Sequence, residues 1–140
     1  MRPRILIFED NDILRSTLKY ILTERGYEVF TFSDPRMCPV YDSIYHKCSE
    51  DYACADIVIS DVKMSTKTGL ELIKERQQKG CKAKYRALMS GDWTDSDLKD
   101  AQELGCHIFR KPFDINKMFR WLDGCIKKIN PERKLSDLLK

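Results

Sequence analysis

The sequence contains no apolar run that approaches the ~20 residues of a membrane-spanning helix. It also lacks a concentration of charge of one sign, because its 25 lysines and arginines are interspersed with 22 aspartates and glutamates. A nucleic-acid reader usually gathers its basic residues on one face, so we expect no direct nucleic-acid binding. The first ten residues, MRPRILIFED, reach acidic side chains too early for a signal peptide. These absences predict a cytoplasmic protein without a membrane partner, whose six cysteines are mainly reduced.

Five short apolar segments, rich in β-branched residues, predict five strands. They span residues 4–8, 28–32, 56–60, 86–90 and 106–110. Amphipathic helical patterns lie between strands, among them one at about 12–25, one that begins at the capping residue Thr94, and one from Asp114 to about Ile129. The alternation predicts a single α/β domain whose parallel sheet carries helices on both faces. In such sheets ligands bind beyond the carboxyl ends of the strands.

Polar side chains stand at the carboxyl ends of four predicted strands. Glu9 and Asp10 follow the first strand, Asp61 follows the third, Ser90 ends the fourth, and Lys111 follows the fifth. Three carboxylates at close quarters repel one another, and Mg²⁺ would relieve the repulsion because it prefers oxygen ligands. A lysine and a serine hydroxyl beside that metal would suit a dianion such as phosphate. These residues together predict a phosphate-handling crevice at one edge of the sheet.

The motifs ILIFED, ISDVKMSTKTGLEL, ALMSG and FRKPFD follow one another in this order. With them the chain resembles the receiver domain of two-component response regulators, over nearly its whole length. The resemblance implies a flavodoxin-like doubly wound fold, with a five-stranded parallel sheet in the order 2-1-3-4-5. It further implies a receiver domain at residues 1–129, with an enlarged cysteine-bearing segment at about 34–55 and a short tail at 130–140.

The resemblance also implies a role for each strand-end residue. Asp61 would be the phosphoacceptor, taking a phosphoryl group from the phosphohistidine of a sensor histidine kinase or a phosphotransfer protein. Lys111 and Ser90 would contact the phosphoryl oxygens. Such a domain is not an enzyme with a separate substrate, and it catalyses only its own phosphorylation and dephosphorylation. The implied ligands of Mg²⁺ or Mn²⁺ belong to Glu9, Asp10, Asp61 and, through its backbone carbonyl, Lys63.

The loops around the phosphate site depart from the usual family pattern. Ser65 stands where proline is usual and Thr68 where aspartate is frequent, so we expect a looser loop after the phosphoacceptor. Lys63 and Asp92 have opposite charges and flank the pocket. They could pair across its mouth and shield the aspartyl phosphate from water. The alternative is a pair of exposed charges worth about 0–1 kcal/mol together.

The residue that usually couples phosphorylation to the docking face is also replaced. Ile108 stands where receivers commonly carry tyrosine or phenylalanine, three residues before the lysine. Phe109 is adjacent, but the alternation of side chains along a strand points it to the opposite face of the sheet. We therefore expect Trp93, on the loop after the strand-end serine, to take over part of the switching role.

The connection between the second and third strands is longer than usual and rich in cysteine. Its Cys38, His46, Cys48 and Cys54 could bind Zn²⁺ or iron, because thiolates and imidazole are preferred ligands of such metals. The spacing lacks the CxxC knuckle that marks a zinc site. Buried or idle thiols, or a disulfide between two of them, therefore remain open alternatives.

Two other functions are alternatives to the phosphoacceptor hypothesis. A haloacid-dehalogenase-like phosphatase also uses a strand-end aspartate, but it needs a second aspartate two residues later, where this chain has Lys63. A receiver-like binding module would instead dispense with phosphorylation and act as a metal or redox sensor through the cysteine segment. If the 140 residues are the complete protein, we expect a stand-alone regulator whose downstream protein target docks near residues 94–129.

Overall fold

Five strands form one parallel sheet in the order β2-β1-β3-β4-β5, which is the predicted order. The computed structural model describes residues 2–37, 52–112 and 114–136. Its strands are β1 (Arg4–Phe8), β2 (Glu28–Phe32), β3 (Ile57–Asp61), β4 (Tyr85–Ser90) and β5 (His107–Arg110). The described part also contains the helices α1 (Asp12–Glu24), α2 (Gly69–Gln78), α3 (Asp95–Glu103) and α4 (Ile115–Ile126). The chain therefore has the α/β architecture that the sequence predicts.

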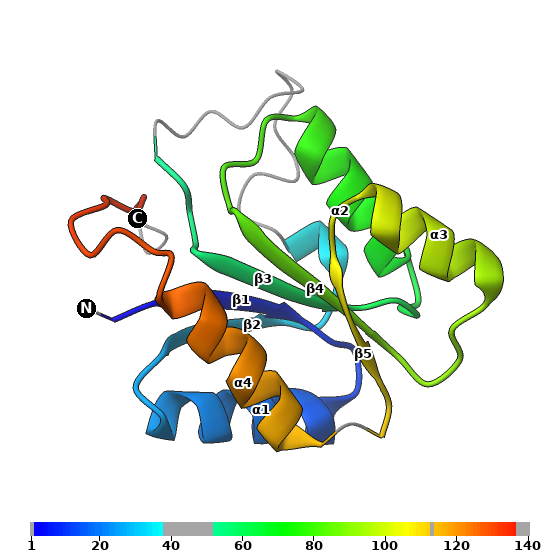
Figure 1. The fold of residues 1–140 in the computed structure, drawn as a ribbon. Coiled ribbons are helices and arrows are strands. Elements are labelled where there is room, and N and C mark those ends of the chain that lie inside the picture. Colours follow the sequence, from blue (N-terminus) through cyan, green and yellow to red (C-terminus); the bar gives the residue numbers. More distant parts are fainter. Residues whose placement is uncertain (1, 38–51, 113, 137–140) are drawn as a thin grey trace.

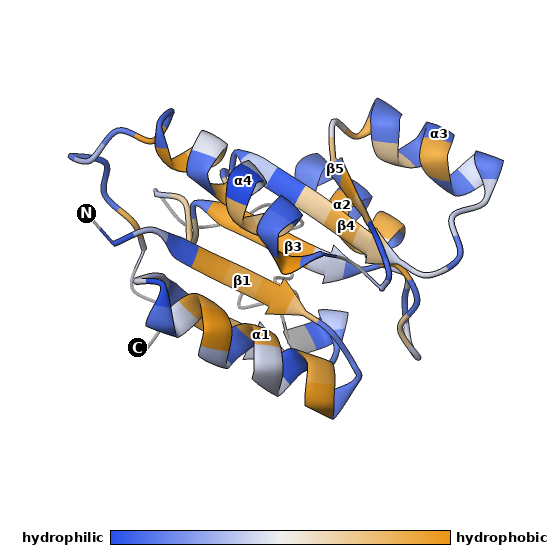
Figure 2. Ribbon diagram, turned by 60° about the horizontal axis from the view of Figure 1, so that its bottom comes forward, coloured by the Kyte–Doolittle hydropathy of each residue, from blue (hydrophilic) through white to orange (hydrophobic). Residues whose placement is uncertain are grey.

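The sheet lies between two layers of helices, with α1 and α4 on one face and α2 and α3 on the other (Figure 1). Alternate residues along β1 and β3 enter the two apolar clusters, so that Ile5 and Ile57 pack with α1 and α4, while Leu6 and Val58 pack with α2 and α3. All five residues of β3 are buried, because helices cover both faces of this central strand. Figure 2 shows β1 and β3 as largely apolar ribbons, whereas the helices carry both apolar and polar residues.

Polar caps fix where each helix begins. The Thr94 hydroxyl accepts from the Asp97 N–H, and the Asp114 carboxylate accepts from the Asn116 N–H, as predicted for these two capping positions. Helix α4 ends at Ile126, so the predicted extension to Ile129 is wrong by three residues. Its last carbonyls instead accept hydrogen bonds from N–H groups three residues further on, which is the spacing of a 3₁₀ turn. Within the described residues, no helix has both the length and the apolar character to cross a bilayer.

The connection between β2 and β3 begins with a single 3₁₀ turn at Pro35–Met37. Residues 38–51 lie outside the described residues, and they include Cys38, His46 and Cys48 of the predicted metal set. The fourth member, Cys54, is buried and forms no disulfide with another described residue. Because only one of the four candidate ligands is described, the Zn²⁺ or iron site gains no support.

Residues 130–136 fold back onto the end of the sheet where the strands begin. Arg133 donates two hydrogen bonds to the Asp56 carboxylate, from Nε to Oδ1 at 2.7 Å and from a terminal nitrogen to Oδ2 at 2.5 Å. The Ser136 N–H donates to the Ala53 carbonyl at 2.9 Å, and Arg4 donates to the Ser136 carbonyl at 2.6 Å. Asp56 is only 7% exposed, so this segment covers a carboxylate that would otherwise face water.

Candidate functional site

Three carboxylates meet at the carboxyl ends of β1 and β3. These strands are neighbours, and the register that pairs Phe8 with Ser60 carries Glu9 and Asp61 to the same edge. Glu9 is fully buried and Asp61, the last residue of β3, is 6% exposed, whereas Asp10 is exposed. One oxygen atom from each of the three side chains lies within 4.8 Å of the others. Parallel pairing thus brings together carboxylates that lie up to 52 positions apart in the sequence.

Lys111 reaches this cluster from the end of β5. Its Nζ lies 2.6 Å from Glu9 Oε1 and 3.1 Å from Asp61 Oδ1. Burial alone would lower the pKa of Lys111, but its hydrogen bonds to Glu9 and Asp61 outweigh burial and raise the pKa. Burial, followed by the hydrogen bond and negative charge of Glu9, raises the pKa of Asp10. One lysine among three acids leaves a surplus of negative charge, which suits a divalent cation with oxygen ligands.

Ser90 and the loop that follows it form another side of the site. Ser90 ends β4 and is 2% exposed, and its hydroxyl accepts a hydrogen bond from the Asp92 N–H at 3.1 Å. The Asp92 carboxylate forms an ion pair with Lys63 Nζ at 2.9 Å. Both side chains are more than half exposed, so the pair bridges the loops after β3 and β4 at the surface.

Trp93 joins the same loop to β5. Its indole Nε1–H donates to the Phe109 carbonyl at 3.0 Å, and its ring packs in the apolar cluster that contains Ile108. Phe109 is buried in the cluster on the opposite face of the sheet, against α1 and α4. The two faces therefore divide as the strand alternation predicts, with Trp93 and Ile108 together on the side of α2 and α3.

A model of the response regulator receiver domain matches residues 5–123. The chain belongs to this family. The aerobic respiration control protein ArcA of Escherichia coli K12 is 34% identical over 117 residues, covering 83% of this chain and 45% of ArcA. The transcriptional regulatory protein FixJ of Bradyrhizobium diazoefficiens is 25% identical over 135 residues, covering 95% of this chain and 61% of FixJ. The chain thus spans about half the length of these curated relatives.

Solved structures show the same fold at low sequence identity. The chemotaxis protein CheY4 of Vibrio cholerae superposes with a TM-score of 0.72 at 24% identity, covering 89% of this chain and 99% of CheY4. A response regulator receiver protein of Pseudomonas putida gives a TM-score of 0.74 at 23% identity, covering 89% of this chain and 98% of that structure. Members of the family hold Mg²⁺ in an acidic pocket, and the carboxylates of Glu9, Asp10 and Asp61 in this receiver domain offer the oxygen donors that such an ion requires.

Two contacts of this receiver domain were not predicted from the sequence. The Thr68 hydroxyl caps α2 and forms a capping box with Glu71, which explains why threonine can replace the frequent aspartate here, because both are good capping residues. The Arg15 guanidinium donates to the Glu9 carbonyl at 2.9 Å. A capping-box pattern, threonine followed three residues later by glutamate, could have identified the first contact. No local pattern marks the second.

Proposed function

We propose that this receiver domain takes a phosphoryl group onto Asp61 from the phosphohistidine of a sensor kinase or phosphotransfer protein. The observation that carries the proposal is the nearly buried Asp61 carboxylate, which lies 3.1 Å from Lys111 Nζ and within 4.8 Å of oxygens of Glu9 and Asp10. Phosphoryl transfer needs mainly positioning and charge neutralisation, and this arrangement supplies both.

In the proposed reaction an Asp61 carboxylate oxygen attacks the phosphorus in line with the leaving histidine. A new oxygen–phosphorus bond forms as the phosphorus–nitrogen bond breaks, and the bonding electron pair returns to the imidazole nitrogen. Lys111, which contacts an Asp61 oxygen before transfer, would then pair with a phosphoryl oxygen. The Ser90 hydroxyl would donate a hydrogen bond to another phosphoryl oxygen. Mg²⁺ or Mn²⁺, held by Glu9, Asp10, Asp61 and the Lys63 carbonyl, would neutralise further negative charge.

Phosphorylation of the isolated chain tests this proposal. Incubation with acetyl phosphate and Mg²⁺ should add the mass of one phosphoryl group, and Asp61→Asn should abolish the addition because an amide oxygen is a poor nucleophile. Asp100→Asn, an exposed carboxylate of α3, is the matched control and should be phosphorylated like the wild type. An unchanged mass in the wild type would instead favour a receiver-like binding module that acts without phosphate.

We further propose that Trp93 links the phosphorylated site to a docking face formed by residues 94–129. The loop supports this proposal, because Ser90 and Trp93 lie three residues apart and the Trp93 indole donates a hydrogen bond to a backbone carbonyl of β5. Movement of the Ser90 hydroxyl toward a phosphoryl group would break its bond from the Asp92 N–H and displace the indole. A downstream protein target would then meet a rearranged surface on α3, β5 and α4. Action as a stand-alone regulator stays a prediction, since the curated relatives are longer.

Trp93 fluorescence should therefore change when beryllofluoride and Mg²⁺ occupy the site. The chain has a second tryptophan, Trp121, which stacks on His107, so the measurement belongs in a Trp121→Phe background. The same background with Asp61→Asn should give no change. An emission spectrum that is identical with and without beryllofluoride would assign the coupling to other residues.

The Lys63–Asp92 ion pair should slow hydrolysis of the aspartyl phosphate. Because both side chains are largely exposed, the effect is small, and Lys63→Ala or Asp92→Ala should accelerate dephosphorylation by up to about fivefold. The double variant should be no faster than either single variant, because each removes the same interaction. Additive effects, or rates equal to that of the wild type, would show that the pair does not shield the phosphate.

A further inference from the structure

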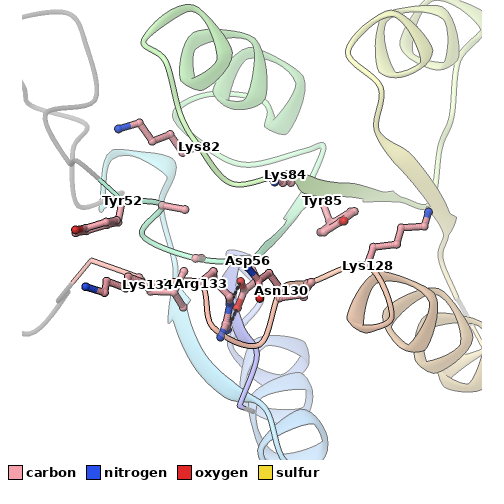
Figure 3. A pocket seen from close by; sticks show the side chains of 13 residues that line it. Tyr52, Asp56, Lys82, Lys84, Tyr85, Lys128, Asn130, Arg133 and Lys134 are labelled. Atoms are coloured by element: carbon pink, nitrogen blue, oxygen red, sulfur yellow. Dashed lines mark hydrogen bonds and ion pairs between the residues drawn. The ribbon is translucent and has the colours of Figure 1, made fainter.

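A second cavity lies at the end of the sheet opposite Asp61. It has a volume of about 420 Å³ and opens where the first residues of β4 and the segment before β3 meet the end of α4 and residues 130–135 (Figure 3). This volume falls in the range of small-molecule sites. The proposed phosphoryl chemistry uses none of the residues that line it.

The residues around this cavity are strongly biased toward positive charge. Its lining contains five basic side chains, Lys82, Lys84, Lys128, Arg133 and Lys134. The one acidic side chain, Asp56, is already paired with Arg133, as Figure 3 shows. Since the net charge of the entire chain is only +3, positive charge is concentrated here, while the phosphoacceptor end is acidic. This lining therefore favours an anionic ligand.

Three of these lysines are available for such a ligand. Lys84, Lys128 and Lys134 are exposed and form no ion pair with any carboxylate of the described residues. They come from three separate parts of the chain, namely the residue before β4, the turn after α4 and the folded-back segment. Surface lysines are usually solvated singly, but here the fold places three of them around one concavity.

The interior of the cavity is apolar beneath this charged opening. Ala55, just before β3, and Tyr85, the first residue of β4, line one side, and Ile129 and Leu135 line it from the segment after α4. The last three are half-buried, so they offer apolar surface that a bare inorganic ion would not use. A planar ring could stack on the Tyr85 phenol or cover the aliphatic side chains, at the energetic gain typical of aromatic contacts.

The walls of the cavity are held by buried polar contacts. Asp56 accepts two hydrogen bonds from Arg133 and one from the Arg4 N–H at 2.9 Å. These bonds raise the pKa of Arg133, with the hydrogen bond to Asp56 as the main cause, and keep it charged. The segment that carries Lys134 and Leu135 is therefore positioned in advance, which lowers the entropic cost of binding a ligand.

We propose that this cavity binds a small organic phosphate in which a planar ring is joined to at least two phosphate charges, as in a nucleoside diphosphate. The ring would occupy the apolar interior, and the phosphates would lie between Lys84 and Lys134 at the opening. The site is separate from the phosphoacceptor, so binding there does not depend on phosphorylation of Asp61.

Titration of the ¹⁵N-labelled full chain with adenosine 5′-diphosphate tests the site, without divalent cations so that the acidic end contributes no binding. Amide resonances of Ala55, Tyr85 and Leu135 should shift. Lys84→Glu and Lys134→Glu should each weaken binding by about tenfold, the effect of one charge-assisted hydrogen bond. Lys19→Glu, which makes the same charge change on exposed α1, should leave binding unchanged.

Pyrophosphate and adenosine serve as the two partial probes. Each should bind more weakly than the nucleoside diphosphate, because pyrophosphate lacks the ring and adenosine lacks the phosphate charges. The proposal is overturned if no pocket resonance shifts, if Lys19→Glu weakens binding as much as the pocket variants, or if pyrophosphate binds as tightly as the nucleotide. Thermal melting of each variant, followed by circular dichroism, separates loss of binding from loss of folding.

Discussion

Gly69→Ala should destabilise the domain by about 1–3 kcal/mol and slow the phosphorylation of Asp61, because Gly69 lies against the strand end that presents the acceptor. A Cβ atom at this position would stand 2.2 Å from the Asp61 carbonyl oxygen and 2.9 Å from Ser60 Oγ. The Gly69 N–H also donates to the Val62 carbonyl at 2.8 Å, which fixes the close approach. The clash is with backbone, so it cannot be relieved by rotating a flexible side chain.

Urea unfolding and the rate of labelling by acetyl phosphate measure the two effects. Gly124→Ala is the matched control, since Gly124 lies inside α4 and an added Cβ would meet no atom within 4 Å. That substitution should stabilise the domain by about 0.5–1 kcal/mol, because alanine favours a helix interior more than glycine does. If Gly69→Ala unfolds at the same urea concentration as the wild type, the close approach of Gly69 to Asp61 does not contribute to the free energy of unfolding.

The strands and the convergence of the site follow from local sequence patterns. Short runs of apolar and β-branched residues mark β1, β2 and β3 to within one residue, because the strands of a doubly wound sheet pack against helices. Once the strands are parallel, their carboxyl ends share an edge, and Glu9, Asp61 and Lys111 must meet there. The prediction of the crevice therefore required only that the strands run parallel, and no knowledge of side-chain conformation.

The ion pair between Asp56 and Arg133, away from the carboxyl ends of the strands, could not be predicted in this way. Asp56 and Arg133 are separated by 77 residues, and each resembles an ordinary surface charge in the sequence. Their pairing depends on how the chain turns after Ile126, where the predicted helix was too long. The steric role of Gly69 is equally hidden, because it arises from the distance between a helix start and a strand end rather than from any local pattern.

Lys111→Met should lower the free energy of unfolding at neutral pH by about 2–4 kcal/mol, because it leaves the carboxylates of Glu9 and Asp61 without their shared cation. Glu9 is fully buried, and its Oε1 lies 2.6 Å from Lys111 Nζ. Methionine keeps an unbranched apolar chain up to the position of the lysine Cε, so the loss is mainly electrostatic rather than a matter of packing. Water at the open mouth near Asp10 moderates the cost relative to a fully enclosed pair.

The pH dependence of this deficit separates charge from packing. Because the pKa of Lys111 is raised in the folded state, its contribution is complete below the ordinary lysine pKa and is lost only as the pH rises through the folded value. The stability difference between variant and wild type should therefore be present at neutral pH and shrink as the pH rises through the folded-state pKa of Lys111.

Urea unfolding at several pH values, with and without Mg²⁺, measures these effects. Mg²⁺ should restore much of the lost stability at neutral pH, since a divalent cation between Glu9, Asp10 and Asp61 would replace the missing positive charge. Lys117→Met, an exposed lysine of α4, should change neither the stability nor its pH dependence. A deficit of equal size at neutral pH and above the folded-state pKa of Lys111 would mean that Lys111 stabilises the domain through its aliphatic chain and not through its charge.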